Sequence, residues 1–268
     1  MGRTLSGKVA LVTGSTRGIG EDIAQALARE GAAVAVTGRN RRDGQRVVDG
    51  IVAEGGRAAF VELDLGDENS VAASVEATVA QFGGLHVLVN NAAPTEFISG
   101  QAGGDASVTD LTTEGWRKVT SVGMDGLFFM LRAAIPAMKA CGGGSIINIS
   151  SVASIQGRGG YDGYTAIKGA MNALTRSIAV NYSGDNIRCN CLVVGPVLTP
   201  GAVASLDQVP TLRQAIADTL LTPDIATPDG ISGPVVFFAS DASYYITGQQ
   251  LTVDGGMSIK MPIPKLDP

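Results

Sequence analysis

The sequence predicts a single doubly wound α/β domain, in which helices cover both faces of a parallel β-sheet. Short runs rich in β-branched residues alternate with longer amphipathic segments along the chain, which is typical of strand–helix–strand units. The 268 residues, of which 45% are hydrophobic and 17% are charged, suffice to bury a substantial core. Because no internal repeat or linker interrupts the pattern, we assign residues 1–257 to one domain and residues 258–268, which contain three prolines, to a C-terminal tail.

The elements are expected in a regular order. In the first half the strands are KVALVT, AVAVTG, AAFVEL and HVLVN, separated by helices that begin near residues 18, 42 and 67. In the second half a long helix ends near a run of three glycines, SIINIS forms the fifth strand, a helix covers about residues 162 to 182, and NIRCNCLVV forms the sixth strand. A stretch punctuated by prolines, from Pro196 to Pro228, precedes one more helix and the final strand QLTVDGG.

Charge and composition argue against several classes of partner. Lys and Arg number 20 and Asp and Glu number 25, which leaves a net charge of −5, and the basic residues are scattered along the chain. We therefore expect neither nucleic acid nor an anionic membrane as a partner. No stretch approaches 18 consecutive apolar residues, and the first residues lack the apolar length of a signal peptide, so we expect a cytoplasmic protein without a membrane span.

The three cysteines and the single histidine indicate no metal site. Cys141 stands alone, while Cys189 and Cys191 lie two residues apart on an expected strand. We expect the latter two to be small buried residues on opposite faces of that strand, rather than a disulfide or metal ligands. His86 opens an apolar strand, so we expect it to have a structural role.

A glycine-rich turn, T-G-S-T-R-G-I-G, directly follows the first strand and opens the first helix. Glycines let the backbone turn sharply and approach a pyrophosphate closely, while free amides at the helix N-terminus donate hydrogen bonds to an anion. The spacing differs from the general dinucleotide pattern G-x-G-x-x-G, and a tight structural turn is the alternative interpretation. The predicted anion-binding residues are Gly14, Ser15, Thr16, Arg17, Gly18, Ile19 and Gly20.

Further short motifs follow the glycine turn in a fixed order. They are Asp64-Leu65, Asn90-Asn91-Ala92-Ala93, Ser151, Tyr164-x-x-x-Lys168, Asn190, Thr247-Gly248 and Asp254-Gly255-Gly256. Together with the turn they make the sequence resemble the classical short-chain dehydrogenase/reductase family, from about residue 7 to residue 257. This resemblance implies a Rossmann fold, a nicotinamide dinucleotide cofactor, a small-molecule carbonyl or alcohol substrate, and a homo-oligomer that is a tetramer or a dimer.

The residues after the second expected strand indicate the cofactor. A carboxylate at this strand end hydrogen-bonds the ribose 2′-hydroxyl of NAD, whereas a nearby arginine accommodates the 2′-phosphate of NADP. In this chain Gly38 stands at the position where that carboxylate would be, and Arg39 follows it. Arg17, inside the glycine turn, is a second positive group. An arginine–phosphate hydrogen bond is worth about 1.5 to 3 kcal/mol, or roughly ten- to hundredfold in preference. We predict NADP(H), as the resemblance also implies; alternatively, Arg39, Arg41 and Arg42 form a solvated basic face.

The resemblance also assigns cofactor contacts that the residues alone do not show. It implies that Asp64, next to Leu65, contacts the adenine amino group, although Asp64 taken alone is equally suited to cap a strand end. It implies that the backbone around Asn91 and Ala92 lines the cofactor. The stretch Val197-Leu198-Thr199 matches the segment that holds the nicotinamide carboxamide in the family, which adds Val197 and Thr199 to the expected cofactor site.

Tyr164 and Lys168 lie four residues apart on an expected helix, so their side chains share one face. Phenols have an ordinary pKa near 10, so acid–base work near neutrality needs about 4 kcal/mol of phenolate stabilisation, which nearby positive charges can supply. We predict that Tyr164 protonates the carbonyl oxygen during reduction and acts as the base in reverse. The resemblance implies that Lys168 assists Tyr164 and holds the nicotinamide ribose, and that Ser151 hydrogen-bonds the substrate oxygen. Ser150 points the other way along its strand.

Two positions depart from the family pattern. Gly123 stands in the long central helix where the family usually has an asparagine that helps to hold a water connecting the lysine to solvent, so we hypothesise a weakened proton relay. The second departure is the segment Val194-Gly195-Pro196, which stands where the family commonly has Pro-Gly. The first departure favours an alternative function, a dinucleotide-binding protein with weak or lost catalysis, whereas Ser151, Tyr164 and Lys168 oppose it.

The substrate and the assembly are less closely defined. The segments expected around the substrate are residues 94–108, which are polar and glycine-rich, and residues 201–227, whose apolar side chains suit a partly apolar ligand or, equally, the core. Steroid, acyl-thioester, quinone, sugar and small ketone substrates all stay open. Small residues on the helix after Tyr164 permit close packing with another helix, as in the dimer interface that the resemblance implies; they are Ala166, Gly169, Ala170 and Ala173.

Overall fold

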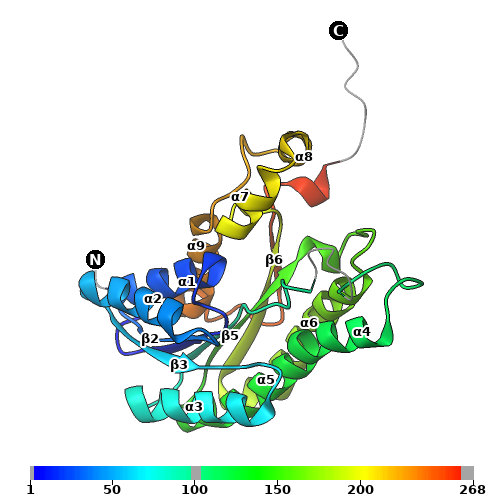
Figure 1. Cartoon of the computed structure of the whole chain (residues 1–268). Coiled ribbons are helices and arrows are strands. Elements are labelled where there is room, and N and C mark those ends of the chain that lie inside the picture. The colour runs from blue at the N-terminus through cyan, green and yellow to red at the C-terminus, as the bar shows by residue number, and fades with distance from the viewer. Residues whose placement is uncertain (1–2, 98–103, 261–268) are drawn as a thin grey trace.

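The computed structural model describes residues 3–97 and 104–260, which form a parallel seven-stranded sheet with helices on both faces (Figure 1). The first-half elements are β1 (Val9–Val12), α1 (Gly18–Arg29), β2 (Ala33–Gly38), α2 (Arg41–Ala53), β3 (Arg57–Glu62), α3 (Glu68–Phe82) and β4 (Val87–Asn90). They are followed by α4 (Thr113–Thr120), α5 (Gly126–Ala140), β5 (Gly144–Ser151), α6 (Asp162–Asn181), β6 (Ile187–Val194), α7 (Pro200–Leu206), α8 (Pro210–Ala217), α9 (Asp229–Ala239) and β7 (Gln250–Val253). The doubly wound α/β prediction is confirmed.

The strand order, β3-β2-β1-β4-β5-β6-β7, locates the functional edge of the sheet. From β1 the next strands, β2 and β3, are added toward one edge of the sheet. From β4 the next strands, β5, β6 and β7, are added toward the other edge. A crevice forms outside the carboxyl ends of parallel strands where the winding direction reverses, and ligands of doubly wound sheets bind there. In this chain the reversal falls between β1 and β4, which are direct neighbours in register from Ala10 and Val87 onward.

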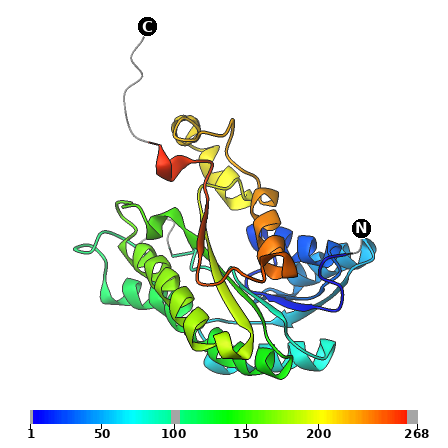
Figure 2. The same cartoon turned by 180° about the vertical axis from the view of Figure 1, so that it is seen from behind.

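Two apolar layers hold the sheet between the helices. One layer packs α1, α2 and α9 against one face through side chains such as Leu27 and Phe238. The other packs α3, α5 and α6 against the opposite face through side chains such as Met130 and Met171. Figure 2 shows the two groups of helices from behind, on either side of the strands. The central strands are buried on both faces, which is why they read as nearly continuous apolar runs rather than alternating ones.

One helical stretch, Thr113–Ala140, runs through α4, a π-helical turn at Ser121–Asp125 and α5. Its 28 residues reach a mean hydropathy of 1.2 over an 18-residue window, so by length and composition it could cross a membrane. In this fold one side of the stretch packs into the core, where Met130 and Met138 are fully buried, while Phe128 on its other side is 51% exposed. The stretch therefore acts as the central core helix of the domain.

Most of the expected elements agree with the structure, and two points differ. Cys189 and Cys191 do not lie on opposite faces: both contact side chains of the α5 and α6 side, because residues two apart on a strand share a face. The proline-punctuated stretch contains two short helices, α7 and α8, which project beyond the carboxyl edge of the sheet (Figure 1). Of the expected tail, residues 261–268 lie outside the described residues, and the boundary at residue 257 stays a prediction.

Candidate active site

The glycine turn between β1 and α1 has the geometry that only glycine allows. Gly14 and Gly18 have φ angles of +64° and +60°, in the left-handed region that favours glycine. A Cβ on Gly20 would lie 2.3 Å from the Gly14 carbonyl oxygen, and a Cβ on Gly14 would lie 2.9 Å from Ala92 Cβ. The turn is therefore packed closely against its own backbone and against the segment that follows β4.

Thr13 and Asn91 fasten these two segments together. Thr13 Oγ1 accepts hydrogen bonds from the backbone amides of Asn91 and Ala92, both at 3.0 Å. Asn91 Nδ2 donates to the carbonyl oxygens of Thr13 at 3.0 Å and Gly14 at 3.2 Å. Asn91, Ala92 and the glycine turn thus form one rigid edge at the crevice between β1 and β4.

Ser15 braces this edge from inside. Its hydroxyl donates to Val12 O at 2.7 Å and accepts from Thr37 N at 2.8 Å, and its amide donates to Thr37 O at 2.9 Å. Because Ser15 is fully buried, these bonds join the ends of β1 and β2. The hydroxyl and amide of Ser15 are therefore hydrogen-bonded within the fold.

The N-terminus of α1 offers donors to an anion. Its N-cap residue is Arg17, which makes no side-chain capping hydrogen bond, whereas α2, α3, α4 and α7 are capped by side chains, respectively Asn40, Asp67, Thr112 and Thr199. The first amides of a helix have no partner within the helix and carry the positive end of its dipole. Together with the close-packed glycines, this uncapped end fits the pyrophosphate of a dinucleotide.

Arg39 lies at the end of β2, beside the turn. Both Glu96 carboxylate oxygens accept hydrogen bonds from Arg39 Nη2, at 3.1 and 2.9 Å. This bond raises the pKa of Arg39, so its guanidinium stays charged. A Cβ on Gly38 would lie 2.7 Å from Thr16 Cγ2. An acidic side chain at position 38, where NAD-dependent proteins have the carboxylate that binds the ribose 2′-hydroxyl, would therefore require Thr16 to move. The structure thus brings Thr16, Gly38 and Arg39 together at one end of the crevice.

Asp64 and Leu65 follow β3 and make mainly local contacts. Asp64 Oδ1 accepts from Gly66 N at 2.9 Å, and Asp64 N donates to Ser70 Oγ at 2.9 Å, as in a residue that closes a strand end. Leu65 is 9% exposed and touches Gly126 at the start of α5. These contacts agree with the capping alternative for Asp64, and its expected adenine contact stays a prediction.

Tyr164 and Lys168 share one face of α6, as the spacing predicts. Lys168 is 3% exposed, its Nζ donates to the Ile149 carbonyl oxygen at 2.7 Å, and Nζ lies 5.6 Å from the centre of the Tyr164 ring. Ser151 ends β5, where its Oγ accepts from Ala153 N at 3.2 Å, so the hydroxyl hydrogen stays available to a ligand. Ser150 is buried and its hydroxyl donates to the Lys168 carbonyl oxygen at 3.2 Å.

Asp105 is a site residue that the sequence reasoning missed. Its Oδ1 accepts from Gly163 N at 2.9 Å and its Oδ2 accepts from Tyr164 N at 2.7 Å, so a carboxylate from the segment before α4 caps the first turn of α6. Asp105 is 7% exposed. A Cβ on Gly163 would come within 2.9 Å of Asp105 Oδ1, which explains a glycine at this position. Asp105 therefore fixes the backbone that carries Tyr164.

Gly123 lies within the π-helical turn and faces α6. A Cβ on Gly123 would come within 2.2 Å of Ile167 Cδ1, so Ile167 fills the space that a side chain at position 123 would need. Ile167 precedes Lys168 on α6 and is 2% exposed. The side chain of Ile167, one residue before the buried lysine, therefore fills the space that the asparagine usual in the family would need at position 123.

Thr199 reaches the glycine turn from the far half of the chain, and Val197 lies two residues before it. Thr199 Cγ2 lies 3.5 Å from the position a Cβ would take on Gly18, and Thr199 Oγ1 accepts from Ala202 N to cap α7. Val197 pairs with Ala226 in an isolated β-bridge. A Cβ on Gly195 would lie 2.7 Å from Asp254 Cα, which explains the glycine in Val194-Gly195-Pro196.

The buried cysteines offer neither a nucleophile nor thiolate ligands. Burial raises the pKa of the Cys189 thiol to about 12 and that of the Cys191 thiol to about 11, so both are protonated near neutrality. Within residues 3–97 and 104–260, no three His, Cys, Asp or Glu side chains are arranged to hold a metal ion.

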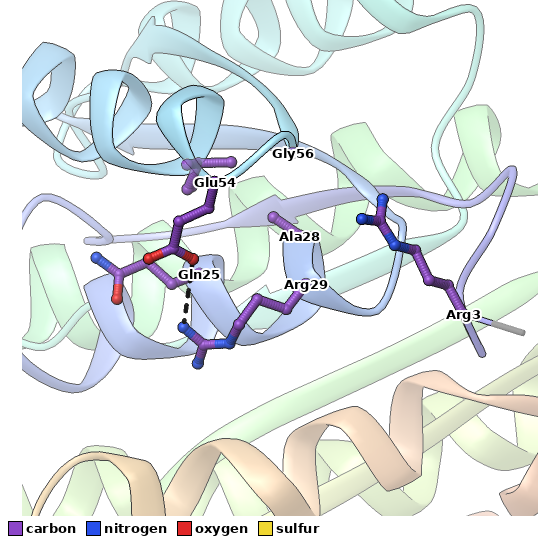
Figure 3. Close-up of a pocket in the computed structure, with 7 residues that line it drawn as sticks. Arg3, Gln25, Ala28, Arg29, Glu54 and Gly56 are labelled. Carbon is purple, nitrogen blue, oxygen red and sulfur yellow. Dashed lines mark ion pairs between the residues drawn. The ribbon is translucent and has the colours of Figure 1, made fainter. Parts of the chain in front are cut away.

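A separate pocket lies at the C-terminal ends of α1 and α2 (Figure 3). Arg29 and Glu54 form an ion pair of 3.9 Å in it, and Arg3 lies across from them. The length of α1, about 18 Å at 1.5 Å per residue, separates this pocket from the glycine turn. It is therefore not part of the site described above.

Comparisons with known proteins agree with this geometry. A family model described as enoyl-(acyl carrier protein) reductase matches residues 14–258. The 3-alpha-(or 20-beta)-hydroxysteroid dehydrogenase of Mycobacterium tuberculosis H37Rv is 38% identical over 256 residues, which cover 96% of this chain and 91% of that protein. Gluconate 5-dehydrogenase from Burkholderia cenocepacia J2315, solved with NADP and tartrate, is 30% identical with a TM-score of 0.88, covering 97% of this chain and 99% of that one. A 7 alpha-hydroxysteroid dehydrogenase solved with NADH and 7-oxo glycochenodeoxycholic acid is 29% identical with a TM-score of 0.87, covering 95% and 96%.

A glycine turn at the winding reversal of a doubly wound sheet, with a tyrosine–lysine pair on a neighbouring helix, defines an oxidoreductase with a Rossmann fold. The family model spans most of the chain, and relatives well above 30% identity match it almost end to end. The chain belongs to the short-chain dehydrogenase/reductase family.

Proposed function

We propose that the chain is an NADP(H)-dependent oxidoreductase that interconverts a carbonyl and an alcohol, with Tyr164 as the acid and base. The observation that carries this proposal is the buried Lys168 ammonium, 5.6 Å from the Tyr164 ring and on the same helix face. The bound nicotinamide would supply or accept the hydride. The names of the relatives, which are dehydrogenases of hydroxyl compounds, support this reaction class.

Each catalytic side chain has one task in this proposal. Tyr164 donates its phenolic proton to the carbonyl oxygen during reduction, and takes it back during oxidation. The Lys168 ammonium stabilises the phenolate electrostatically, more strongly in a buried site than in water. Ser151 donates its hydroxyl hydrogen to the substrate oxygen and orients it toward Tyr164.

The preference for NADP(H) is proposed from Arg39 and the glycine beside it. Arg39 supplies a charged donor at the end of β2, and the Gly38 position leaves no room for an NAD-reading carboxylate without a shift of Thr16. One solved relative holds NADP and another holds NADH, so the family fold accepts both. We expect a preference of roughly tenfold or more for NADPH.

The substrate and the assembly are proposed more broadly. Leu212 and Leu221 in the α7–α8 region are 48% and 60% exposed and offer an apolar face to a partly apolar substrate. On α6, a Cβ on Gly169 would meet no atom within 4 Å, so this small-residue face is open to a second copy of the chain. We propose a cytoplasmic homo-oligomer, a dimer or a tetramer, without nucleic-acid or membrane partners.

A second candidate function is dinucleotide binding with weak or lost catalysis. Ile167 occupies the space beside Gly123 where the family's asparagine side chain would need to lie, so this route for a proton from Lys168 to solvent is altered. The two candidates predict the same cofactor binding and differ only in turnover.

The experiment that separates them follows NADPH consumption by absorbance against activated diketones, quinones, ketosteroids and β-ketoacyl thioesters, with NADH in parallel. Turnover with NADPH preferred supports the proposed enzyme. Turnover with NADH preferred contradicts the role of Arg39. Calorimetrically proven NADPH binding without turnover on the whole panel favours the second candidate.

A further inference from the structure

Arg39, the residue proposed to read the 2′-phosphate, already has an anionic partner within the protein. Glu96 comes from the segment after β4, 57 residues further along the chain, and both of its oxygens are within hydrogen-bond distance of one guanidinium nitrogen, Arg39 Nη2. The side chains are 63% and 45% exposed, so the pair lies at the rim of the crevice. A cofactor phosphate that reaches Arg39 meets this carboxylate as well.

The backbone holds Glu96 in place. Thr95 N donates to the Ala93 carbonyl oxygen at 2.8 Å, and Phe97 N donates to Pro94 O at 2.9 Å, so residues 93–97 form a tight turn. This turn begins directly after Ala92, which is fixed to Thr13 of the glycine turn. The carboxylate is therefore directed at Arg39 by a short, hydrogen-bonded segment rather than by the side chain alone.

The neighbouring arginines show that this pairing is particular to Arg39. Arg41 lies 3.8 Å from Glu62, beyond hydrogen-bond distance, and stacks over the Phe60 ring instead. Arg46 binds Glu21 at 2.6 Å and also the Thr16 carbonyl oxygen, as a brace between α1 and α2. Of these three arginines, Arg39 is the one whose partner carboxylate comes from the loop beside the glycine turn.

We infer that Glu96 is a specificity-determining residue that weakens recognition of the 2′-phosphate by occupying Arg39. This inference rests on the proposed function of Arg39. A carboxylate on the guanidinium competes for its donors and repels the phosphate, whereas the 2′-hydroxyl of NADH carries no charge and is affected far less. Glu96 thereby keeps the preference for NADPH moderate and lets the site accept NADH as well.

The test measures dissociation constants of NADPH and NADH by fluorescence titration, because the two ligands differ only in the 2′-phosphate. The informative variant is Glu96→Gln, which keeps the size of the side chain and removes its charge. We expect about two- to fivefold tighter NADPH binding, as for removal of one exposed charge interaction, with NADH binding changed less than twofold. Glu62→Gln is the matched control, since it removes a carboxylate paired with the nearby Arg41.

Three outcomes are decisive. An unchanged ratio of NADH to NADPH dissociation constants in Glu96→Gln, with a lowered ratio in Arg39→Gln, overturns the inference and leaves the role of Arg39 intact. An equal rise in Glu96→Gln and Glu62→Gln shows a general charge effect and also overturns it. An unchanged ratio in Arg39→Gln contradicts the proposed role of Arg39 in recognising the 2′-phosphate, and the inference fails with it.

Discussion

Two of the helices that begin at the carboxyl edge of the sheet, α1 and α6, differ in how the amides of their first turn are bound. The N-terminus of α1 begins with Arg17 and Gly18 and has no side-chain cap. The N-terminus of α6 also lacks a cap from its own N-cap residue, yet Asp105 accepts hydrogen bonds from Gly163 N and Tyr164 N. Within the described residues, no N-cap side chain binds the first amides of α1, whereas a carboxylate binds two of the first amides of α6.

The difference matches what each end has to do. Free amides and a positive helix dipole form a binding site for a ligand anion, and a protein carboxylate there would displace that ligand. The end of α6 carries a reacting side chain, Tyr164, whose position must be fixed before substrate arrives. At these two helix ends, the carboxylate of Asp105 positions Tyr164, and the uncapped start of α1 leaves room for a ligand anion.

Among the changes that test this comparison of the two helix ends, the largest effect is expected at Asp105. Asp105→Ala leaves the buried amide of Gly163 and the partly buried amide of Tyr164 without an acceptor and should lower the free energy of unfolding in urea by about 2 to 4 kcal/mol. Turnover should fall more than tenfold while the dissociation constant of NADPH changes less than twofold. Asp105→Asn keeps one oxygen acceptor and should recover part of the turnover.

The control for Asp105 is Asp67, which caps α3 through Asn69 N on another part of the fold. Asp67→Ala should lower stability by about 1 kcal/mol without changing turnover. Normal turnover in Asp105→Ala would show that the cap does not position Tyr164.

The next effect reverses the comparison by giving α1 a cap of its own. Arg17→Asn places a strong N-cap residue at an extended backbone position and should raise the free energy of unfolding by about 0.5 to 1.5 kcal/mol. It should also weaken NADPH binding about tenfold, because the side chain takes up the amides that face the pyrophosphate. Arg17→Ala removes the same charge without adding a cap. Equal NADPH affinity in both variants would contradict the proposal that the uncapped amides of α1 bind the cofactor.

A third effect, on stability first and on turnover only in a double variant, is expected beside α6, at Gly123. Gly123→Asn alone should cost about 1 to 3 kcal/mol of stability through overpacking, because its Cβ meets Ile167 Cδ1. Adding Ile167→Val removes that atom and should recover at least half of the loss. If the asparagine restores a proton route from Lys168, turnover of the double variant should exceed that of Ile167→Val; equal or lower turnover would count against the relay hypothesis.

The smallest effect lies at the opposite edge of the sheet, away from both helix ends. Burial, with a contribution from the charge of Lys8, lowers the pKa of His86 below its ordinary value of 6.5, and Nδ1 accepts from Val9 N at 3.1 Å. The unfolded chain then binds the proton more readily, so stability falls as the pH drops below 6.5. His86→Asn keeps an acceptor and should flatten this part of the stability–pH curve without changing turnover at neutral pH; an unchanged slope in urea unfolding would assign it to carboxylates instead.

The sequence was sufficient to predict what depends on local pattern. The strand–helix order, the glycine turn and the shared face of Tyr164 and Lys168 follow from periodicity and short spacing, which the chain expresses within a few residues. The roles of Asp105 and Glu96 could not be predicted from the sequence, because their partners lie 58 and 57 residues away and no local spacing indicates such a contact. The one available clue was the uncapped start of the helix at Asp162, which required an acceptor from elsewhere.

The central claim, that Tyr164 is the acid and base of an NADP(H)-dependent oxidoreductase, is tested most directly by Tyr164→Phe. This change removes the phenolic hydroxyl and leaves the ring beside Lys168. With a substrate that the wild-type protein reduces, turnover should fall by about 10² to 10⁴-fold, while calorimetry shows NADPH bound as tightly as by the wild type. Equal turnover in the two proteins would contradict the account.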